Sequence, residues 1–260
     1  MAIHRQAKLR RFVIVGSILG AGLAFYNRAA IVEQVFDTAG SSKAAPEIKN
    51  TVDTSIQKQL SELSYTGQQV HTVNNNQPFF TADELKSDNG AVQKLSRRDW
   101  LGRPQVANAM LNKSLMPSAK REPLTVRTPG YKVYRFNDNG REKYLYNRSH
   151  LIGYQLTGLN NNSRNLITGT VAFNATHSDD NQQSMEDFEN QIASYLRADS
   201  THYVRYRVTP IYRNIERVPR GVEIEAQSVK DNAIRLNVYI FNGQPNWQIN
   251  YYTGSAIHTN

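Results

Sequence analysis

The chain contains no cysteine among its 260 residues. This absence excludes a disulfide framework, a thiol nucleophile and a zinc site with cysteine ligands. It does not favour the cytosol, because a domain of this size can bury a core large enough to be stable without disulfides. The chain also lacks an internal repeat and a base-reading module such as a helix-turn-helix or a zinc finger.

The apolar run near the N-terminus is short for a membrane span. Residues 12–26 read FVIVGSILGAGLAFY, whereas a transmembrane helix usually needs ~20 apolar residues. Four basic residues precede this run: Arg5, Lys8, Arg10 and Arg11. A basic segment before a short apolar one is typical of an export signal whose basic side stays in the cytoplasm. Residues 1–30 are therefore interpreted as a signal peptide or an uncleaved signal anchor, with a buried core helix as the alternative.

Acidic residues are fewer than basic ones. The chain has 22 Asp and Glu and 31 Lys and Arg, which gives a formal net charge of +9. Such an excess favours a polyanionic partner, either nucleic acid or an anionic membrane or wall surface. Hydrophobic residues make up 39% of the chain. That share is sufficient for one sizeable domain with appendages, or for two small domains.

The order of patterns along the chain predicts an α+β fold. Residues 31–64 are polar and read as a linker with a short helix over 51–63, and residues 65–260 have the texture of a folded domain. Short helices are expected within 79–86 and over 103–111. Alternating strands are expected in a hairpin around NDNG (137–140), in 165–174 up to a break at Gly169, and in 202–212, 222–229, 234–242 and 247–251. Strands with one clear helix between them indicate an antiparallel sheet and the α+β class.

The clearest helix covers residues 184–197. Ser184 and Asp187 fit a capping box at its start. Its apolar residues share one face: Met185, Phe188, Ile192, Tyr195 and Leu196. Helical phase puts Glu189 just inside the edge of this face and Glu186 farther round. A carboxylate there needs a partner or a nearby cation, so Glu189 is either an edge residue with a salt bridge or a carboxylate near a metal.

Two further residues carry possible chemistry. His150 ends the apolar, aromatic stretch LYNRSH and is either an ordinary structural histidine or a general base. Asn174 follows a strand-like run and is either a turn residue or an oxygen ligand of the kind that Mg²⁺ prefers. Together with Glu189 they offer a base, a metal ligand and a carboxylate from three different elements.

Three motifs in this order resemble the ββα-metal (His-Me finger) DNA/RNA non-specific endonucleases, of the streptodornase and DNA-entry nuclease type. They are NRSH (147–150), NLITGTVAFN (165–174) and MEDFENQIASYL (185–196), and the resemblance covers roughly residues 65–254. It implies an antiparallel sheet core with a ββα-metal finger made of a strand hairpin, a loop and a helix. The family usually has Asp-Arg-Gly-His at 147–150, so Asn147 and Ser149 depart from its pattern.

The resemblance also implies a mechanism. His150 would be the general base, and one Mg²⁺, or Mn²⁺ in its place, would be held by Asn174 and by waters hydrogen-bonded to Glu189. The products would carry 5′-phosphates. Arg148 matches the arginine of the motif and would clamp phosphate, with a surface ion pair as the alternative. The choice of Glu189 over Glu186 as the acidic residue depends on helical phase, and His177 is interpreted as a loop residue.

A basic cluster in the C-terminal part is a candidate nucleic-acid surface, with an ordinary solvated face as the alternative. It contains Arg205, Arg207, Arg213, Arg217 and Arg220. Phosphate contacts from such residues would be independent of base sequence and sensitive to salt.

The sequence thus predicts an exported, Mg²⁺-dependent, non-specific endonuclease for DNA and possibly RNA. It would be a monomer, secreted or anchored to the outer face of the membrane of a Gram-positive-type bacterium. Two other classes stay open: a catalytically silent nucleic-acid receptor of the same fold, and a wall-binding surface module.

Overall fold

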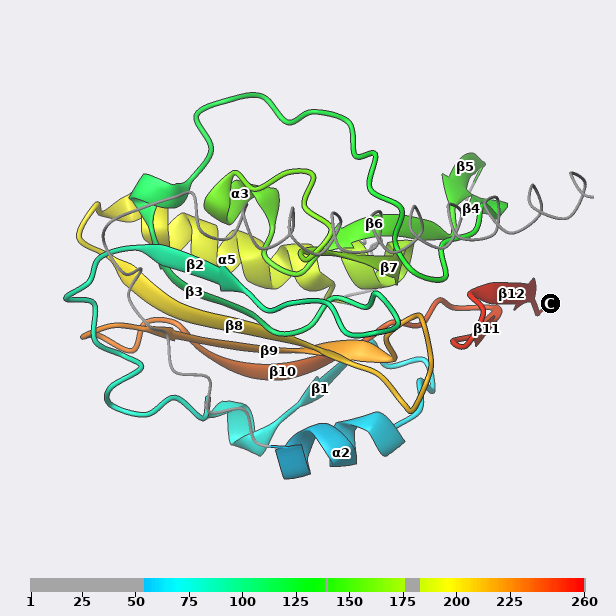
Figure 1. Cartoon of the computed structure of the whole chain (residues 1–260), viewed down its shortest axis with the longest axis horizontal. Helices are drawn as coiled ribbons and strands as arrows, with labels where there is room; N and C mark the ends of the chain where they lie inside the picture. Colours follow the sequence, from blue (N-terminus) through cyan, green and yellow to red (C-terminus); the bar gives the residue numbers. More distant parts are fainter. Residues whose placement is uncertain (1–53, 139, 176–182, 260) are drawn as a thin grey trace, which may run out of the picture. The chain divides into compact units, whose positions relative to one another are not determined.

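A six-stranded antiparallel sheet forms the centre of the fold, with strand order β1-β10-β9-β8-β3-β2 (Figure 1). The computed structural model describes residues 54–138, 140–175 and 183–259. The predictions for residues 1–30, and for the linker up to residue 53, lie outside these ranges. Within them, no helix is long and apolar enough to cross a membrane.

The strands of this sheet are β1 (Val70–Thr72), β2 (Val92–Leu95), β3 (Ala107–Asn112), β8 (Tyr203–Ile211), β9 (Gly221–Ser228) and β10 (Arg235–Phe241). Three of the four predicted C-terminal strands are therefore in the main sheet. The fourth, β11 (Trp247–Asn250), pairs instead with β12 (Ser255–His258) in a separate two-stranded sheet. The class is α+β with an antiparallel sheet core, as predicted.

Two expected helices are wrong. Residues 107–112 form the strand β3, which pairs with β2 and β8 and is buried at every position. A run buried on both faces has no period that separates strand from helix. Residues 79–86 make only a turn, closed by a hydrogen bond from the Glu84 amide to Thr81 Oγ1 (3.3 Å). Two 3₁₀ helices, Asn74–Asn76 and Lys113–Leu115, complete this half of the chain.

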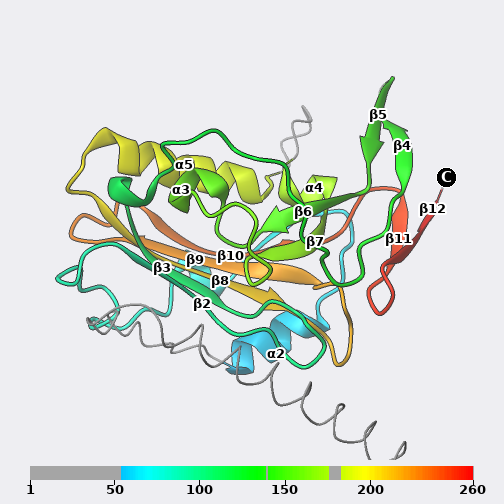
Figure 2. The ribbon, with the colours of Figure 1, turned by 45° about the horizontal axis from the view of Figure 1, so that its top comes forward.

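Helix α5 (Met185–Ala198) packs across one face of the sheet, where alternate strand residues are apolar (Figure 2). Ser184 and Asp187 form the predicted capping box, which fixes the start of the helix. On the opposite face, α2 (Thr54–Glu62) buries Leu60 against Phe241 and its neighbours, and it confirms the short helix predicted over 51–63.

The strand pair β6 (Tyr146–His150) and β7 (Leu166–Thr170) lies beside α5 and, with it, makes the ββα unit. Two short helices flank the pair: α3 (Tyr154–Thr157) follows β6, and α4 (Val171–Asn174) follows β7. The predicted break at Gly169 is wrong, because the strand continues to Thr170. A glycine is needed there, since a Cβ atom would overlap Ser149 Oγ and the Phe173 ring.

The predicted hairpin around NDNG is confirmed as β4 (Arg135–Asp138) and β5 (Arg141–Tyr144). It is a two-stranded sheet of its own and leads directly into β6, beyond the end of the main sheet (Figures 1 and 2). The hairpin that holds His150 is therefore β6 with β7, one strand pair farther along the chain.

Candidate active site

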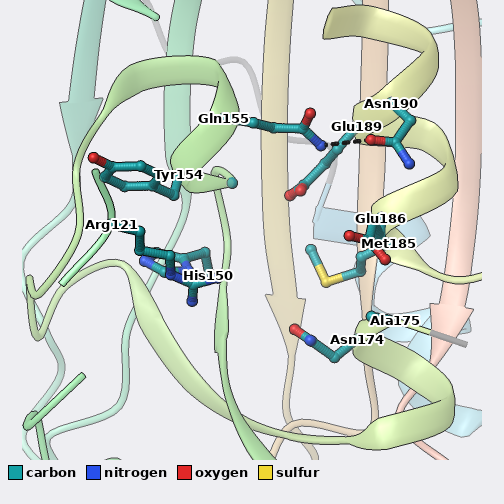
Figure 3. A pocket seen from close by; sticks show the side chains of 11 residues that line it. Arg121, His150, Tyr154, Gln155, Asn174, Ala175, Met185, Glu186, Glu189 and Asn190 are labelled. Atoms are coloured by element: carbon teal, nitrogen blue, oxygen red, sulfur yellow. Dashed lines mark hydrogen bonds between the residues drawn. The ribbon is translucent and has the colours of Figure 1, made fainter. Parts of the chain in front are cut away.

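His150, Asn174 and Glu189 line one pocket of about 240 Å³ (Figure 3). They come from the end of β6, the end of α4 and the inner face of α5. Figure 3 shows His150 and Arg121 on one side of the pocket and Asn174, Glu186 and Glu189 on the other. The fold thus brings together three residues that the sequence could associate only through motif order.

His150 is buried, with 7% of its surface exposed. Its Nε2 lies 2.7 Å from the carbonyl oxygen of Asn160. A carbonyl oxygen only accepts hydrogen bonds, so Nε2 carries the proton and Nδ1 has the lone pair of the neutral ring. Burial lowers the pKa of His150 to about 4, the Asn160 hydrogen bond opposes this shift, and the charge of Arg121 adds to it. The ring is therefore neutral at physiological pH.

Glu189 faces inward, as helical phase predicts, and is 8% exposed. Burial raises the pKa of its carboxyl to about 8. Hydrogen bonding from Gln155 opposes the shift, the charge of Glu186 increases it, and the Gly153 amide and Arg121 oppose it. Glu186 also lines the pocket but is only half-buried, so Glu189 is the carboxylate most in need of a positive charge.

Gly153, which precedes α3, lies directly against the Glu189 carboxylate. A Cβ atom at this position would overlap the carboxylate carbon and both of its oxygens. The close approach lets the Gly153 amide act as a hydrogen-bond donor to Glu189. The glycine is required here by space, since its backbone is not in the left-handed region.

Asn174 is the last residue of α4, and its side chain points into the pocket (Figure 3). The loop after β10 holds the start of α4: Asn242 Oδ1 accepts from the Thr170 amide (2.8 Å), and Gln244 Oε1 accepts from the Ala172 amide (3.0 Å). Thr170 Oγ1 caps the helix by accepting from the Phe173 amide. Both ends of this loop therefore fix the short helix that presents Asn174.

The donor atoms of the pocket fit a hard divalent cation. Among residues 54–138, 140–175 and 183–259, no group of three or more His, Asp or Glu could hold a metal ion. Asn174 and Glu189 instead supply an amide oxygen and a buried carboxylate. Mg²⁺ prefers oxygen ligands and keeps several waters, so it needs few protein ligands. A cation would also compensate the buried charge of Glu189.

Arg148 lies outside the lining of the pocket. Its Nε donates to the Val126 carbonyl (2.7 Å), and its guanidinium lies over the Tyr131 ring, 4.6 Å from the centroid. Arg148 therefore holds the segment that precedes β4, and its expected contact with phosphate stays a prediction. Asn147, at the first motif position, pairs with Gly169 in the β6–β7 ladder and is also outside the lining.

Arg121 is a pocket residue that sequence reasoning missed. It belongs to the irregular segment between the 3₁₀ helix Lys113–Leu115 and β4, and it is exposed. Its charge lowers the pKa of both His150 and Glu189. A segment without helical or strand period offers no signal that one of its arginines reaches the site. His177, weighed as a loop residue, lies outside the described residues.

The structure overturns Arg205 and Arg207 as nucleic-acid contacts. Each is 1% exposed, on the face of the sheet opposite α5. Glu84 Oε1 accepts from both guanidinium groups (3.2 and 3.1 Å), and Glu225 Oε2 accepts from Arg207 Nε (2.6 Å). Phe80 covers both guanidinium groups at 4.8 Å. These arginines are part of a buried ionic network and cannot reach a polyanion.

The remaining members of that cluster differ among themselves. Arg220 pairs with the buried Glu216 and lies over the Tyr251 ring at 4.3 Å, so it is engaged within the fold and only partly exposed. Arg213 donates to the Ser61 carbonyl. Arg217 is exposed. The five arginines therefore do not form one continuous binding surface.

Comparison with known proteins identifies the family of the chain. The family model described as DNA/RNA non-specific endonuclease matches residues 85–230. The structure of NucA from Streptococcus agalactiae with magnesium bound is 27% identical, covers 83% of this chain and 100% of its own, and has a TM-score of 0.66.

Two further structures are similar. NucA from the same organism with no metal bound is 25% identical, with coverage of 80% of this chain and 98% of its own and a TM-score of 0.65. The Sda1 nuclease with bound zinc shares the fold at 24% identity, with coverage of 65% and 82% and a TM-score of 0.56. Because the family model spans more than half of the chain, the protein belongs to the DNA/RNA non-specific endonuclease family and is a metal-dependent endonuclease.

Proposed function

We propose that the protein is an exported, Mg²⁺-dependent phosphodiester hydrolase that cleaves DNA, with RNA as a second substrate, and leaves 5′-phosphates. The observation that carries this proposal is the convergence of His150, Asn174 and Glu189 on one pocket. Each supplies a different part of the chemistry: a neutral base, an oxygen ligand and a buried negative charge. NucA with magnesium bound supports the choice of metal.

His150 acts as the general base. Its Nε2–H donates to Asn160, which fixes the ring and leaves the Nδ1 lone pair to take a proton from water as the water attacks phosphorus. Because the pKa of His150 is lowered to about 4, the ring does not need to lose a proton first at neutral pH. The bond broken is that to the 3′ oxygen, which leaves and takes a proton from solvent, so the phosphate stays on the 5′ end.

Asn174 would hold the cation through its amide oxygen, and Glu189 would hold it through water. When bound, Mg²⁺ supplies positive charge for the phosphoryl oxygens as negative charge develops on them. Glu189 must be ionised to do this, so metal binding competes with the proton that burial favours on its carboxyl. Metal affinity is therefore expected to rise with pH.

Phosphate is bound by Arg121, which is exposed at the edge of the pocket beside His150 (Figure 3). Its guanidinium presents a fork of donors that suits phosphate oxygens. Arg148, on the same strand as His150, is a second phosphate contact. To bind phosphate it must release its contacts to Val126 and Tyr131. Phosphate contacts of this kind do not read base sequence, which agrees with non-specific cleavage.

The N-terminal segment supports export. A basic stretch followed by a short apolar run leads the chain to the outside of the cell, where it is either released or stays anchored, and it works as a monomer. The similarity to a streptococcal NucA supports a Gram-positive-type host.

The test is cleavage of a plasmid by the purified full-length chain, with Mg²⁺, with EDTA, and with Mg²⁺ restored. Cleavage that requires Mg²⁺ and that falls ~10²–10⁴-fold in His150→Ala is expected, since a general base contributes that much. Labelling of the product ends should detect 5′-phosphates. DNA binding without cleavage by the wild-type chain would favour the catalytically silent receptor, and cleavage unchanged by EDTA would remove the assigned metal site.

A further inference from the structure

Positive charge is concentrated in one segment of the folded part. Residues 116–148, called here the basic segment, contain eight Lys and Arg and three Asp and Glu. Residues 149–260, which follow it, contain nine Lys and Arg and ten Asp and Glu. The basic segment includes Arg121 at the pocket, continues through the β4–β5 strand pair and ends at Arg148, two residues before His150. A polyanion that runs from the pocket along the basic segment therefore meets an excess of positive charge.

The two faces of the β4–β5 strand pair have different surroundings. On one face Phe136 packs against Trp247, with ring centroids 5.7 Å apart, and its neighbour Lys143 pairs with Asp138. The other face carries the cross-strand pair of Arg135 and Tyr144. The β4–β5 strand pair is called here the arm, and this second face is its outer face, on which Tyr144 is 44% exposed.

The outer face combines an aromatic ring with a cation. The Arg135 guanidinium lies over the Tyr144 ring, 5.1 Å from its centroid. The same guanidinium meets Glu142 at 3.3 Å, but both side chains are more than half exposed, so this ion pair is weak and leaves Arg135 able to bind phosphate. Val133, two residues before Arg135 and outside β4, is also exposed. Aromatic rings that stack bases beside basic groups that bind phosphate are the features of single-strand binding surfaces.

We propose that the outer face of the arm is a second contact site for single-stranded nucleic acid, where an unpaired base stacks on the Arg135–Tyr144 pair. This inference rests on the proposed function for the identity of the ligand, which is the substrate strand that passes through the pocket. The site increases affinity for long single strands and takes no part in the chemical step.

The distance between the pocket and the outer face of the arm sets the length of strand that can bind to both. Tyr144 and His150 are six residues apart, with a bend at Leu145 between β5 and β6, so about 20 Å is the upper limit for the distance between their Cα atoms. At about 3.4 Å per stacked nucleotide, a strand of about six nucleotides covers the whole of this limit. A stacked trinucleotide spans about 10 Å, half of it, and is therefore the short ligand of the comparison.

Binding to the full-length His150→Ala protein tests this proposal without cleavage. Three ligands are compared by fluorescence or by competition. They are an oligothymidylate of about 16 nucleotides, an oligothymidylate of about three nucleotides, and a duplex as long as the first. Tyr144→Ala is expected to weaken binding of the long single strand roughly 5- to 10-fold, because one base stack is lost, and to change binding of the trinucleotide less than about twofold. The duplex should also change little, since its bases are already stacked.

Two control variants separate stacking from structure. Tyr144→Phe keeps the ring and should bind like the parent, whereas Tyr252→Ala removes another tyrosine with the same 44% exposure and should leave binding unchanged. Equal losses for short and long ligands, an equal loss in Tyr252→Ala, or no loss in Tyr144→Ala would each overturn the proposal. Cleavage by the His150→Ala protein would instead contradict the role of His150 in the proposed function, and the binding comparison would then be made in EDTA.

Discussion

Glu84 and Glu189 are buried to nearly the same degree, 6% and 8% exposed, and yet their surroundings are opposite. Glu84 lies on one side of the sheet and accepts from the guanidinium groups of Arg205 and Arg207. Glu189 lies on the other side, against amide donors and a second carboxylate, and the pKa of its carboxyl is raised to about 8. A buried carboxylate with its cations built in has its charge compensated within the fold, whereas one without them is available to bind a cation from solution.

The largest difference should appear in activity when the proposed metal ligands are removed. Asn174→Ala is expected to lower kcat/KM more than ~100-fold and more than Glu189→Ala, because a direct ligand is lost rather than a contact through water. Mg²⁺ titration of plasmid cleavage measures both variants. Equal losses, or a greater loss in Glu189→Ala, would contradict the assignment of Asn174 as the direct ligand.

The charge compensation of Glu84 is tested by removing one of the two arginines that pair with it. Arg207→Met leaves Glu225 and part of Glu84 without compensation in a dry environment, so unfolding free energy should fall by about 3–5 kcal/mol. Urea denaturation measures the change, and the protein that remains folded should retain its activity. Arg217→Met, an exposed arginine between β8 and β9, is the matched control and should change stability by less than about 0.5 kcal/mol.

Glu189→Gln, in contrast to Arg207→Met, should stabilise the metal-free protein. The carboxyl of Glu189 holds its proton to about pH 8 in the folded chain but only to about 4.5 when unfolded. The unfolded state therefore binds fewer protons between these values, and wild-type stability falls as pH rises through this window. At pH 8 the amide variant is expected to be more stable by about 1–3 kcal/mol while being less active.

Denaturation in EDTA between pH 4.5 and 8 measures the Glu189 effect. Glu186→Gln, on the same helix but half-buried, is the control and should alter the slope of stability against pH less. Identical slopes for the wild type and Glu189→Gln would mean that Glu189 is already compensated in the metal-free protein, and the contrast with Glu84 would disappear.

The smallest change is a methyl group at Gly153. Gly153→Ala would push the Glu189 carboxylate out of its place, so activity and Mg²⁺ affinity should fall about 10-fold, by analogy with the loss of other groups that orient metal ligands. The double variant Gly153→Ala/Glu189→Ala should be no worse than Glu189→Ala alone. Additive losses would show that Gly153 acts on something other than Glu189.

Much of the site could be predicted where a residue lies on a regular element. The phase of the helix Met185–Ala198, fixed by its capping box, correctly turned Glu189 inward. Alternation in β8 correctly put Arg205 and Arg207 on one face, but alternation does not say what covers that face, and residues 79–84 and β9 bury both arginines. Arg121 could not be found, because its position depends on an irregular segment that crosses from one element to another.

The loop Asn242–Gln244 gives the assembly of the site a fixed order in time. It holds Thr170 and Ala172 at the start of the helix that presents Asn174, although it comes some seventy residues later in the chain (72 for each contact). During synthesis, these two contacts to the helix of Asn174 can therefore form only after residue 244 has been added.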